Sequence, residues 1–334
     1  MRYRNLGQTG TLVSTLCLGT MNFGKESDEP TAHGQLDRFV ESGGNFIDTA
    51  DVYQRGTSEE FIGRWLSKRG RHDDLVIATK ARMPMGEGPN EAGLSKPRLM
   101  RTVDASLRRL QVEAIDLYQA HCWDPRTPVE ETLETFDDLV RAGKVRYVGV
   151  SNFAGWQLQR AALLARHNGW ARVATLQPQY NLLAREIEWE LVPVCLLEGI
   201  GILPWSPLGG GWLTGKYRPD QRPTGATRLG EDPGRGVEAY DKRNIDRTWR
   251  VLDAVREIAA DRGATPAQIA LAWVTDRPGV SSTILGARTV EQLDDNLGAA
   301  DLELSEAERQ RLDDASDPGL PAYPYGFIAD LGAR

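Results

Sequence analysis

Short runs of β-branched and aliphatic residues recur along the chain, separated by longer stretches in which apolar and polar residues mix. Eight of these runs are predicted strands: Leu16–Thr20, Phe46–Ala50, Leu75–Lys80, Ile115–Ala120, Val145–Val150, Val173–Gln177, Ile200–Trp205 and Thr283–Gly286. Most of them are apolar without alternation, which is typical of strands that are covered on both faces. The runs therefore predict a buried sheet.

The stretches between the strands have the spacing of amphipathic helices. Val129, Leu133 and Phe136, for example, recur at intervals of three or four residues, which places them on one face of a helix. Some helix starts carry a capping box, in which a Thr at the N-cap pairs with a Glu or Gln three residues later. These are Thr57 with Glu60, Thr127 with Glu130, Thr265 with Gln268 and Thr289 with Gln292.

The alternation of eight strands with helices predicts an α/β fold, a (β/α)8 TIM barrel, and a doubly wound sheet is the alternative. The opening segment Tyr3–Val13 contains Gly7 and Gly10 as turn residues, so it is expected to form an N-terminal β-hairpin. This hairpin could close the bottom of the barrel. Two helical patterns, Asp246–Arg262 and Pro266–Asp276, precede the last strand, so one of them is an extra helix.

No linker or low-complexity segment divides the chain. Residues 1–334 are therefore expected to form a single barrel domain, with a C-terminal tail at residues 318–334. The segment Gly209–Tyr240 is rich in glycine, proline and charged side chains. A segment of that length without periodicity is usually a functional loop.

Composition narrows the class of protein. Hydrophobic residues make up 40% of the chain and charged residues 26%, which are ordinary values for a globular protein and exclude a fibrous or disordered one. The longest apolar run, Leu191–Leu197, has seven residues, whereas a membrane span needs roughly 20. The net charge of −7 and the lack of a basic run make nucleic acid and anionic membranes poor candidate partners.

Two further features concern the compartment. The first residues of the chain are not followed by the apolar stretch of a secretory signal. The three cysteines, Cys17, Cys122 and Cys195, are far apart, which argues for reduced thiols and against a disulfide framework. A cytoplasmic protein is therefore expected, and these features do not predict its oligomeric state.

Polar residues fall at the end of nearly every predicted strand. In chain order they are Gly19-Thr20, Asp48, Lys80, His121, Ser151-Asn152, Gln177, Trp205-Ser206 and Gly286-Arg288. Catalytic side chains of (β/α)8 barrels lie at the carboxyl ends of the strands. The pattern therefore predicts a functional site at that end.

Asp48, Tyr53, Lys80 and His121 are candidate catalytic residues, because they lie at or just after three consecutive strands. A free phenol has a pKa of about 10, and a nearby Lys80 ammonium is expected to lower the pKa of Tyr53. Asp48 would hold Lys80 charged and oriented, and a neutral His121 could donate to a carbonyl oxygen. Such a group would donate a proton to an oxyanion that forms at a carbonyl.

Each of these residues alone has a simpler interpretation. Asp48 could cap a helix, Tyr53 could be a packing residue, Lys80 could form a structural ion pair, and His121 could be an ordinary core residue. Their joint placement favours a catalytic role.

Motifs of other cofactor and metal sites are missing from the sequence. No G-x-G-x-x-G, the motif of a Rossmann dinucleotide site, follows a strand. The histidines and cysteines lack the spacing of metal ligands, so no metal site is predicted.

Several segments of the chain resemble the aldo-keto reductases. They are NFIDTADVYQRGTSEEFIG at Asn45–Gly63, ATK at Ala78–Lys80, DLY at Asp116–Tyr118 followed by His121, GVSN at Gly149–Asn152, PWSPLG at Pro204–Gly209, LTGK at Leu213–Lys216 and GARTVEQLDDN at Gly286–Asn296. The resemblance runs from Tyr3 to about Leu304. It is nearest to the branch of bacterial and potassium-channel β-subunit-like proteins, which shares a tryptophan at the position of Trp205.

This resemblance implies a (β/α)8 fold and an NADP-dependent reduction of a carbonyl to an alcohol by hydride transfer. Asp48, Tyr53, Lys80 and His121 would be the catalytic tetrad, with Tyr53 as the general acid. The substrate would be a small-molecule aldehyde, ketone or keto-sugar.

The resemblance also implies a site for NADP(H). Its residues would be Gly19, Thr20, Met21, Asp48, Ser151, Asn152, Gln177, Trp205, Ser206, Pro207, Leu208, Gly210, Lys216, Gly286, Arg288, Gln292 and Asn296. Ser151, Asn152 and Gln177 would bind the carboxamide, and Trp205 would stack on the nicotinamide ring. Arg288 would hold the 2′-phosphate, because its guanidinium lies beside the free N–H groups of a helix start.

Bulky side chains near the strand ends suggest a substrate pocket. Phe23 follows the first strand and Trp123 follows His121, and aromatic residues in irregular segments are well placed to line a pocket. We expect Phe23 and Trp123 to flank the substrate beside Tyr53 and His121, which would favour ring-bearing or sugar-like carbonyls. The tail aromatics Tyr323, Tyr325 and Phe327 could add to this wall or simply cover the surface.

Three alternative functions stay open. A reductase of keto-deoxysugars in secondary metabolism would use the same chemistry. A channel-β-like, NADPH-binding redox sensor with weak turnover is of another class, and it is disfavoured by His121, which channel β-subunits commonly lack. A cofactor-free barrel lyase or isomerase is disfavoured by the segment Gly286–Asn296.

Overall fold

The computed structural model describes residues 1–70, 72–225, 227–232, 234 and 236–332. In this part of the chain eight parallel strands form one sheet, in the order β10, β3, β4, β5, β6, β7, β8, β9. Their bounds are β3 (Leu16–Gly19), β4 (Phe46–Asp48), β5 (Val76–Ala81), β6 (Ile115–Ala120), β7 (Val145–Ser151), β8 (Val173–Gln177), β9 (Gly201–Ile202) and β10 (Thr283–Leu285). The N–H of Ile284 donates to the carbonyl of Pro204 at 2.9 Å and joins the two edges of the sheet. The predicted (β/α)8 barrel is confirmed.

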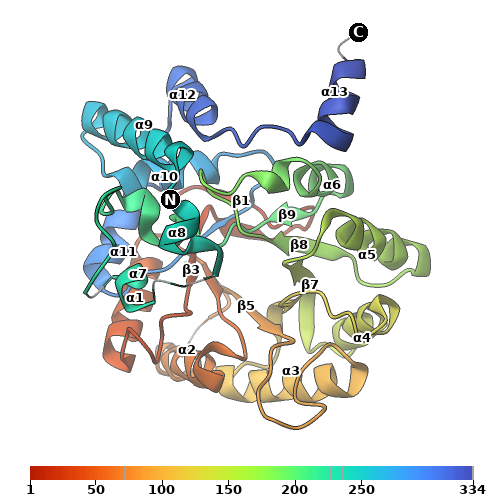
Figure 1. Cartoon of the computed structure of the whole chain (residues 1–334). Coiled ribbons are helices and arrows are strands. Elements are labelled where there is room, and N and C mark those ends of the chain that lie inside the picture. Colours follow the sequence, from red (N-terminus) through yellow and green to blue (C-terminus); the bar gives the residue numbers. More distant parts are fainter. Residues whose placement is uncertain (71, 226, 233, 235, 333–334) are drawn as a thin grey trace.

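Helices surround the barrel in chain order (Figure 1). The longer ones are α1 (Glu29–Glu41), α2 (Thr57–Arg69), α3 (Lys96–Leu110), α4 (Val129–Arg141), α5 (Gly155–Asn168), α6 (Leu191–Glu198), α9 (Asp246–Arg262), α10 (Pro266–Thr275), α11 (Val290–Leu297) and α12 (Glu306–Ser316). Both α9 and α10 precede the last strand, as predicted. Within the residues described, none of the helices is long and apolar enough to cross a membrane.

The N-terminal hairpin closes one end of the barrel. Strands β1 (Tyr3–Asn5) and β2 (Leu12–Ser14) pair antiparallel. Leu6 and Val13 are fully buried and form an apolar cluster with inward residues of the barrel strands, among them Phe46. The end of the barrel that receives the hairpin is therefore filled with hydrocarbon, and the opposite end is left for polar side chains.

The predicted strands match the observed ones closely, except for β9. Its run was predicted to extend from Ile200 to Trp205, but the ladder covers only Gly201–Ile202. Pro204 has no N–H to donate to a ladder. Leu203 and Trp205 still donate to the carbonyls of Leu176 and Pro178 at 2.8 and 2.9 Å, and Trp205 bridges to Gln179 after β8, so the chain keeps to the barrel wall as isolated contacts.

The four predicted capping boxes are only partly confirmed by the structure. The prediction at Thr265 is correct, because Thr265 accepts from the N–H of Gln268 and the side chain of Gln268 accepts from the N–H of Thr265. At Thr289 only half of the box forms: Thr289 caps α11 by accepting from the N–H of Gln292, but the side chain of Gln292 accepts from the N–H of Arg288 at 3.0 Å. The prediction at Thr57 is wrong, because its hydroxyl donates to a backbone carbonyl of the preceding turn. The prediction at Thr127 is also wrong, because its hydroxyl donates to the carboxylate of Asp124 at 2.8 Å.

The segment Gly209–Tyr240 contains short helices, which the sequence did not predict. They are a 3-10 helix at Gly209–Thr214, α7 (Arg228–Glu231), a 3-10 helix at Gly236–Glu238, and the start of α8 (Tyr240–Arg243). Trp212 is fully buried and stacks on Tyr240 with ring centroids 5.5 Å apart. Trp212 also meets Trp249 of α9 edge-on, with ring centroids 5.7 Å apart, and this contact anchors the segment to that helix.

The C-terminal tail does not reach the mouth of the barrel. It forms α13 (Phe327–Gly332), which stands apart from the barrel in Figure 1. Tyr323 is 79% exposed, and Tyr325 donates to the carboxylate of Glu190 at 2.5 Å. Surface packing is therefore the correct interpretation of these tail aromatics; residues 333–334 of the predicted tail lie outside the described residues.

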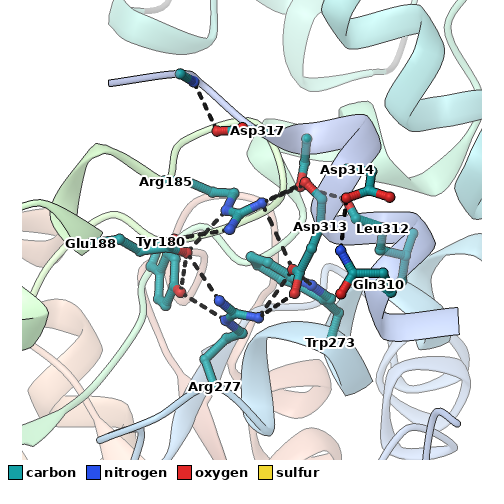
Figure 2. A network of polar contacts seen from close by, with 12 residues as sticks. Tyr180, Arg185, Glu188, Trp273, Arg277, Gln310, Leu312, Asp313, Asp314 and Asp317 are labelled. Carbon is teal, nitrogen blue, oxygen red and sulfur yellow. Dashed lines mark hydrogen bonds and ion pairs between the residues drawn. The ribbon is translucent and has the colours of Figure 1, made fainter. Parts of the chain in front are cut away.

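A network of charged side chains fixes α12 to the barrel (Figure 2). Asp313 of α12 accepts hydrogen bonds from Arg277 at 3.0 Å and from the indole of Trp273 at 2.9 Å. Arg277 also donates to the hydroxyl of Tyr180 at 3.1 Å, and Arg185 donates to the backbone carbonyl of Asp313 at 2.9 Å. The network therefore holds the segment after β8 against the last long helix.

We predict that Asp313→Ala lowers the free energy of unfolding by about 1.5–3 kcal/mol, the range for hydrogen bonds to charged groups. The substitution removes the nearer of the two carboxylates of Arg277, which is 19% exposed, and leaves Glu188 at 3.6 Å. Urea denaturation measures the change. Asp314→Ala is the control, because Asp314 accepts from Gln310 on the exposed side of the same helix. Equal losses in the two variants would contradict the role of the network.

Candidate active site

An ion pair between Asp48 and Lys80 lies at the polar end of the barrel interior. Asp48 is 2% exposed and Lys80 is fully buried, and Lys80 Nζ donates to Asp48 Oδ1 at 2.5 Å. Asp48 Oδ2 accepts from the side-chain amides of Gln119 at 3.2 Å and Gln177 at 2.9 Å. Lys80 donates a second hydrogen bond, to the carbonyl of Thr49 at 2.8 Å. The pair is thus fixed by donors and an acceptor from neighbouring strand ends.

Tyr53 and His121 lie above this ion pair. Tyr53 begins a 3-10 helix, Tyr53–Gly56, in the loop after β4. Its hydroxyl lies 3.4 Å from Lys80 Nζ. The ring of His121 meets the ring of Tyr53 edge-on, with centroids 5.9 Å apart. The structure therefore brings the predicted catalytic residues together in one place.

The protonation states of these residues follow from burial and charge. Burial raises the pKa of Tyr53, and the Lys80 ammonium offsets only part of that rise. The expectation that Lys80 would bring the pKa of Tyr53 below its usual value is therefore wrong, because the phenolate loses more solvation than the ammonium restores. At neutral pH Tyr53 is a protonated phenol that can donate.

Lys80 is a charged ammonium, whereas His121 is uncharged at physiological pH. Burial opposes the ammonium of Lys80, but the Asp48 carboxylate and the Tyr53 hydroxyl outweigh it and raise the pKa of Lys80. Burial, together with the positive charges of Lys80 and Arg82, lowers the pKa of His121 to about 3. His121 is therefore a neutral imidazole at physiological pH. Its Nδ1 is buried and has no hydrogen-bond partner in the structure.

A cavity of about 640 Å³ opens above these residues. Tyr53, His121 and Asp48 line its inner end, and Lys80 lies beneath them. Every residue predicted for the cofactor also lines it: Gly19, Thr20, Met21, Ser151, Asn152, Gln177, Trp205, Ser206, Pro207, Leu208, Gly210, Lys216, Gly286, Arg288, Gln292 and Asn296. The cavity brings these side chains together, and their roles stay predictions.

The residues predicted to bind a carboxamide form a hydrogen-bonded group. Asn152 has a φ of +54°, in the left-handed region where Asn is tolerated. Its side-chain amide donates to the hydroxyl of Ser151 at 2.9 Å, and its side-chain oxygen accepts from the indole of Trp205 at 3.0 Å. Ser151 in turn donates to the carbonyl of Gln177 at 2.7 Å. This arrangement fixes the indole of Trp205 at the side of the cavity.

Two carboxylates of the Gly209–Tyr240 segment contact residues of the predicted NADP(H) site, one of them Arg288, which was predicted to hold the 2′-phosphate. Glu238 accepts a hydrogen bond from the hydroxyl of Ser206, and it is 6% exposed. Glu231 pairs with Arg288 at 2.9 Å. Glu26 lies 3.7 Å from the same guanidinium. A phosphate bound at either position would have to share or replace these contacts.

The predicted substrate-flanking residues are not at the cavity. Phe23 is fully buried in the hydrophobic core, so the expectation that it contacts a substrate is wrong. Trp123 is partly buried and packs edge-on against Phe153, with centroids 5.2 Å apart, and against Trp156 at 5.4 Å. Neither Phe23 nor Trp123 lines the cavity described above. An aromatic residue in a loop next to the barrel can bury itself against helices, which sequence position alone does not reveal.

The sequence reasoning missed three polar residues of the site. Gln119 donates to Asp48 from β6, and Glu231 and Glu238 contact Arg288 and Ser206. Gln119 could have been found, because it is a polar residue inside an apolar strand, two positions before His121. The two glutamates lie in a segment without periodicity, where the sequence carries no information on which side chains point inward.

Comparison with known proteins agrees with this geometry. The profile of the aldo/keto reductase family matches residues 15–317. The chain belongs to the aldo/keto reductase family. The match contains all eight barrel strands and every residue predicted for the site. Members of this family of oxidoreductases generally use a nicotinamide dinucleotide.

Several curated proteins are similar to this aldo/keto reductase over nearly its whole length. The uncharacterized oxidoreductase YrpG of Bacillus subtilis is 38% identical, over 94% of this chain and 95% of its own. The norsolorinic acid reductase of Aspergillus flavus is 35% identical, over 96% of this chain and 81% of its own. A probable voltage-gated potassium channel subunit beta of Arabidopsis thaliana is 35% identical, over 90% and 92%. The predicted family and branch are therefore confirmed.

We predict that the imidazole of His121 does not titrate between pH 5 and 8, because its pKa is lowered to about 3. The ring-proton chemical shift of His121 in NMR, assigned with a His121→Gln variant, measures this. The unfolded chain has a histidine pKa of about 6.5 and binds the proton first, so His121 should reduce stability as the pH falls from about 6.5 toward 3. A titration midpoint near 6.5 in the folded protein would contradict the prediction.

Proposed function

We propose that this aldo/keto reductase reduces the carbonyl of an aldehyde, ketone or keto-sugar to an alcohol with NADPH, and that Tyr53 is the general acid. One observation carries the proposal. Tyr53 is a protonated phenol that borders the cavity and lies 3.4 Å from a buried ammonium. A relative named norsolorinic acid reductase supports reduction as the direction of the reaction.

The residues of the cavity fit a nicotinamide dinucleotide. Amide and hydroxyl groups of Ser151, Asn152 and Gln177 offer paired donors and acceptors beside the catalytic residues, which suits a carboxamide. The indole of Trp205 offers a flat apolar surface. Arg288, next to the N-terminus of α11, suits the 2′-phosphate that distinguishes NADPH from NADH. When bound, the cofactor supplies the hydride for the carbonyl carbon.

The protein's own residues handle the proton. Tyr53 donates its O–H proton to the carbonyl oxygen as negative charge develops there. The phenolate that remains is stabilised by the Lys80 ammonium, which Asp48 holds in place through the 2.5 Å hydrogen bond. A neutral His121 provides one N–H toward the same oxygen and one acceptor. The substrate oxygen would therefore be met by two donors, of which only Tyr53 gives up its proton.

We predict that Tyr53→Phe lowers kcat for carbonyl reduction by at least about 10²-fold, since general acids contribute about 10²–10⁴-fold. NADPH absorbance at saturating aldehyde measures the rate. The dissociation constant of NADPH, from quenching of tryptophan fluorescence, should change little, because the phenol is expected to touch the substrate. Tyr3→Phe, which removes a hydroxyl bonded to Gly43 on the hairpin, is the matched control. A near-normal kcat in Tyr53→Phe would refute the mechanism.

We predict that Arg288→Ala weakens NADPH binding by about 1.5–3 kcal/mol, the range for a hydrogen bond to a charged group, and leaves NADH binding nearly unchanged. Glu231→Gln should have the opposite effect, because Glu231 competes with the 2′-phosphate for the guanidinium. Its tightening of NADPH binding should be about two- to fivefold, as expected for one exposed ion pair.

The control for the second variant is Glu130→Gln, which removes an exposed ion pair with Arg160 far from the cavity. Calorimetric titration with NADPH and NADH gives all the constants. If Arg288→Ala weakened both cofactors equally, Arg288 would be a structural residue and the assignment of the 2′-phosphate would be wrong.

A further inference from the structure

Arg82 lies at the mouth of the barrel, immediately after β5. In the ladder between β5 and β6, Lys80 pairs with Gln119 and Ala81 pairs with Ala120. The N–H of His121 donates to the carbonyl of Ala81 at 2.9 Å. Continued by one residue, this register places Arg82 beside His121, at the strand spacing of about 4.8 Å.

The backbone of Arg82 is unusual. Its φ is +141°, a conformation that glycine adopts readily and that other residues rarely adopt. Strained backbone of this kind persists where the surroundings hold it, and it is common at functional sites. The carbonyl of Arg82 accepts from the N–H of Gly93 at 2.8 Å, which closes the long loop between β5 and α3 onto this residue.

The guanidinium of Arg82 forms no ion pair with any residue that the structure describes. Its Nε is buried without a hydrogen-bond partner, and its Nη1 has only a weak contact with the sulfur of Met83 at 3.9 Å. An arginine is always charged, so such a group is costly unless something pairs with it.

The carboxylate of Asp124, also at this end of the barrel, is already engaged. It accepts hydrogen bonds from the N–H of Leu94 at 2.9 Å, the N–H of Arg126 at 3.1 Å and the hydroxyl of Thr127 at 2.8 Å. Asp124 thus serves to fix the loops around the mouth. Burial opposes the charge of Asp124, but these hydrogen bonds and the charge of Arg82 outweigh burial and lower the pKa of Asp124. Arg82 itself forms no hydrogen bond or ion pair with a carboxylate of the described residues.

We propose that Arg82 is a specificity-determining residue that binds a carboxylate on the substrate, so that the preferred substrates are oxo acids, in which a carbonyl and a carboxylate occur in one molecule. This inference rests on the proposed carbonyl reduction. The planar fork of a guanidinium matches a carboxylate through two parallel hydrogen bonds. One guanidinium also balances one carboxylate charge, whereas a phosphate dianion would leave charge over.

The position of Arg82 relates the two groups of such a substrate. Arg82 does not itself line the cavity, but it follows the strand next to His121, which does. A carbonyl oxygen in contact with Tyr53 and His121 would lie one strand away from Arg82. The carboxylate would therefore be held beside the reacting carbonyl and away from Asp48, whose negative charge would repel it. The positive charge of Arg82 also contributes, after burial and Lys80, to the lowered pKa of His121.

The test compares benzaldehyde with 2-, 3- and 4-carboxybenzaldehyde, which vary the distance between carbonyl and carboxylate. We expect kcat/KM to be higher for at least one carboxylated isomer than for benzaldehyde. In Arg82→Met the ratio of the two kcat/KM values should fall about 10- to 100-fold, as expected for loss of a charge-assisted pair. Arg82→Lys keeps the charge without the planar fork, and its ratio should be intermediate.

Arg126→Met is the matched control. It removes the same charge from the same end of the barrel, but Arg126 is 67% exposed and lies 3.9 Å from Asp124. Its ratio should stay within about twofold of the unsubstituted protein, because exposed charges are screened. An equal fall of the ratio in Arg126→Met and Arg82→Met would reduce the effect to net charge and overturn the proposal.

A binding measurement separates this inference from the proposed function. Calorimetry compares benzoate with benzamide, with and without NADP⁺, in the unsubstituted protein and in Arg82→Met. If benzaldehydes are reduced but no isomer is preferred and benzoate binding does not depend on Arg82, the inference is wrong and the carbonyl reduction stands. If no aldehyde is reduced but Arg82→Met abolishes benzoate binding, the carboxylate site stands and the proposed reaction is wrong.

Discussion

A buried ion pair, Asp48 with Lys80, is the constraint on which the site depends. Removing either partner would leave a charge in the barrel interior at a cost of several kcal/mol, because neither is solvated there. The pair is retained only because other groups complete it. Gln119 and Gln177 donate to Asp48, and the carbonyl of Thr49 accepts from Lys80. The buried pair therefore requires polar side chains on neighbouring strands, and Gln119 of β6 and Gln177 of β8 meet this requirement.

The alternation of side chains along the strands divides the barrel interior into two parts. Phe46 and Asp48 lie two positions apart on β4, and Leu117 and Gln119 lie two positions apart on β6, so each pair points the same way. The first member of each pair belongs to the apolar end, where the hairpin adds Leu6. The second member belongs to the polar end. Each of these strands thus contributes one side chain to the apolar packing at one end of the barrel and one to the polar cluster at the other end.

Features set by local pattern could be predicted from the sequence. The eight barrel strands, the hairpin and the proximity of Asp48, Tyr53, Lys80 and His121 follow from apolar runs and from residues at their ends, because parallel strands bring those ends to one edge. The length of β9 could also have been predicted, because Pro204 has no N–H to donate and its position is visible in the sequence. The wrong prediction of a cap at Thr127 could not be avoided from the sequence, because the Asp124 carboxylate takes the hydrogen bond of its hydroxyl.

Features set by burial were predicted less well. The sequence places Phe23 just after a strand end, but only the packing of the whole core decides that its ring is fully buried. The prediction that the pKa of Tyr53 is lowered was wrong for the same reason. The sequence indicates that Lys80 lies near Tyr53, and its charge lowers the pKa of the phenol. The larger effect, the rise of the pKa caused by burial, depends on all the residues that cover the ring.

Arg288, which lines the cavity, and Arg82, which follows β5 beside His121, differ in their ion pairs. Arg288 has carboxylates from two segments, Glu26 and Glu231, whereas Arg82 has none among the described residues. A ligand anion at Arg288 must replace an existing ion pair, so only the difference between the two pairings contributes to its binding free energy. An anion at Arg82 would displace no ion pair, because the nearest interaction of that cation is its longer-range attraction to Asp124. The position next to His121 is therefore where a modest change in the substrate would change its binding most.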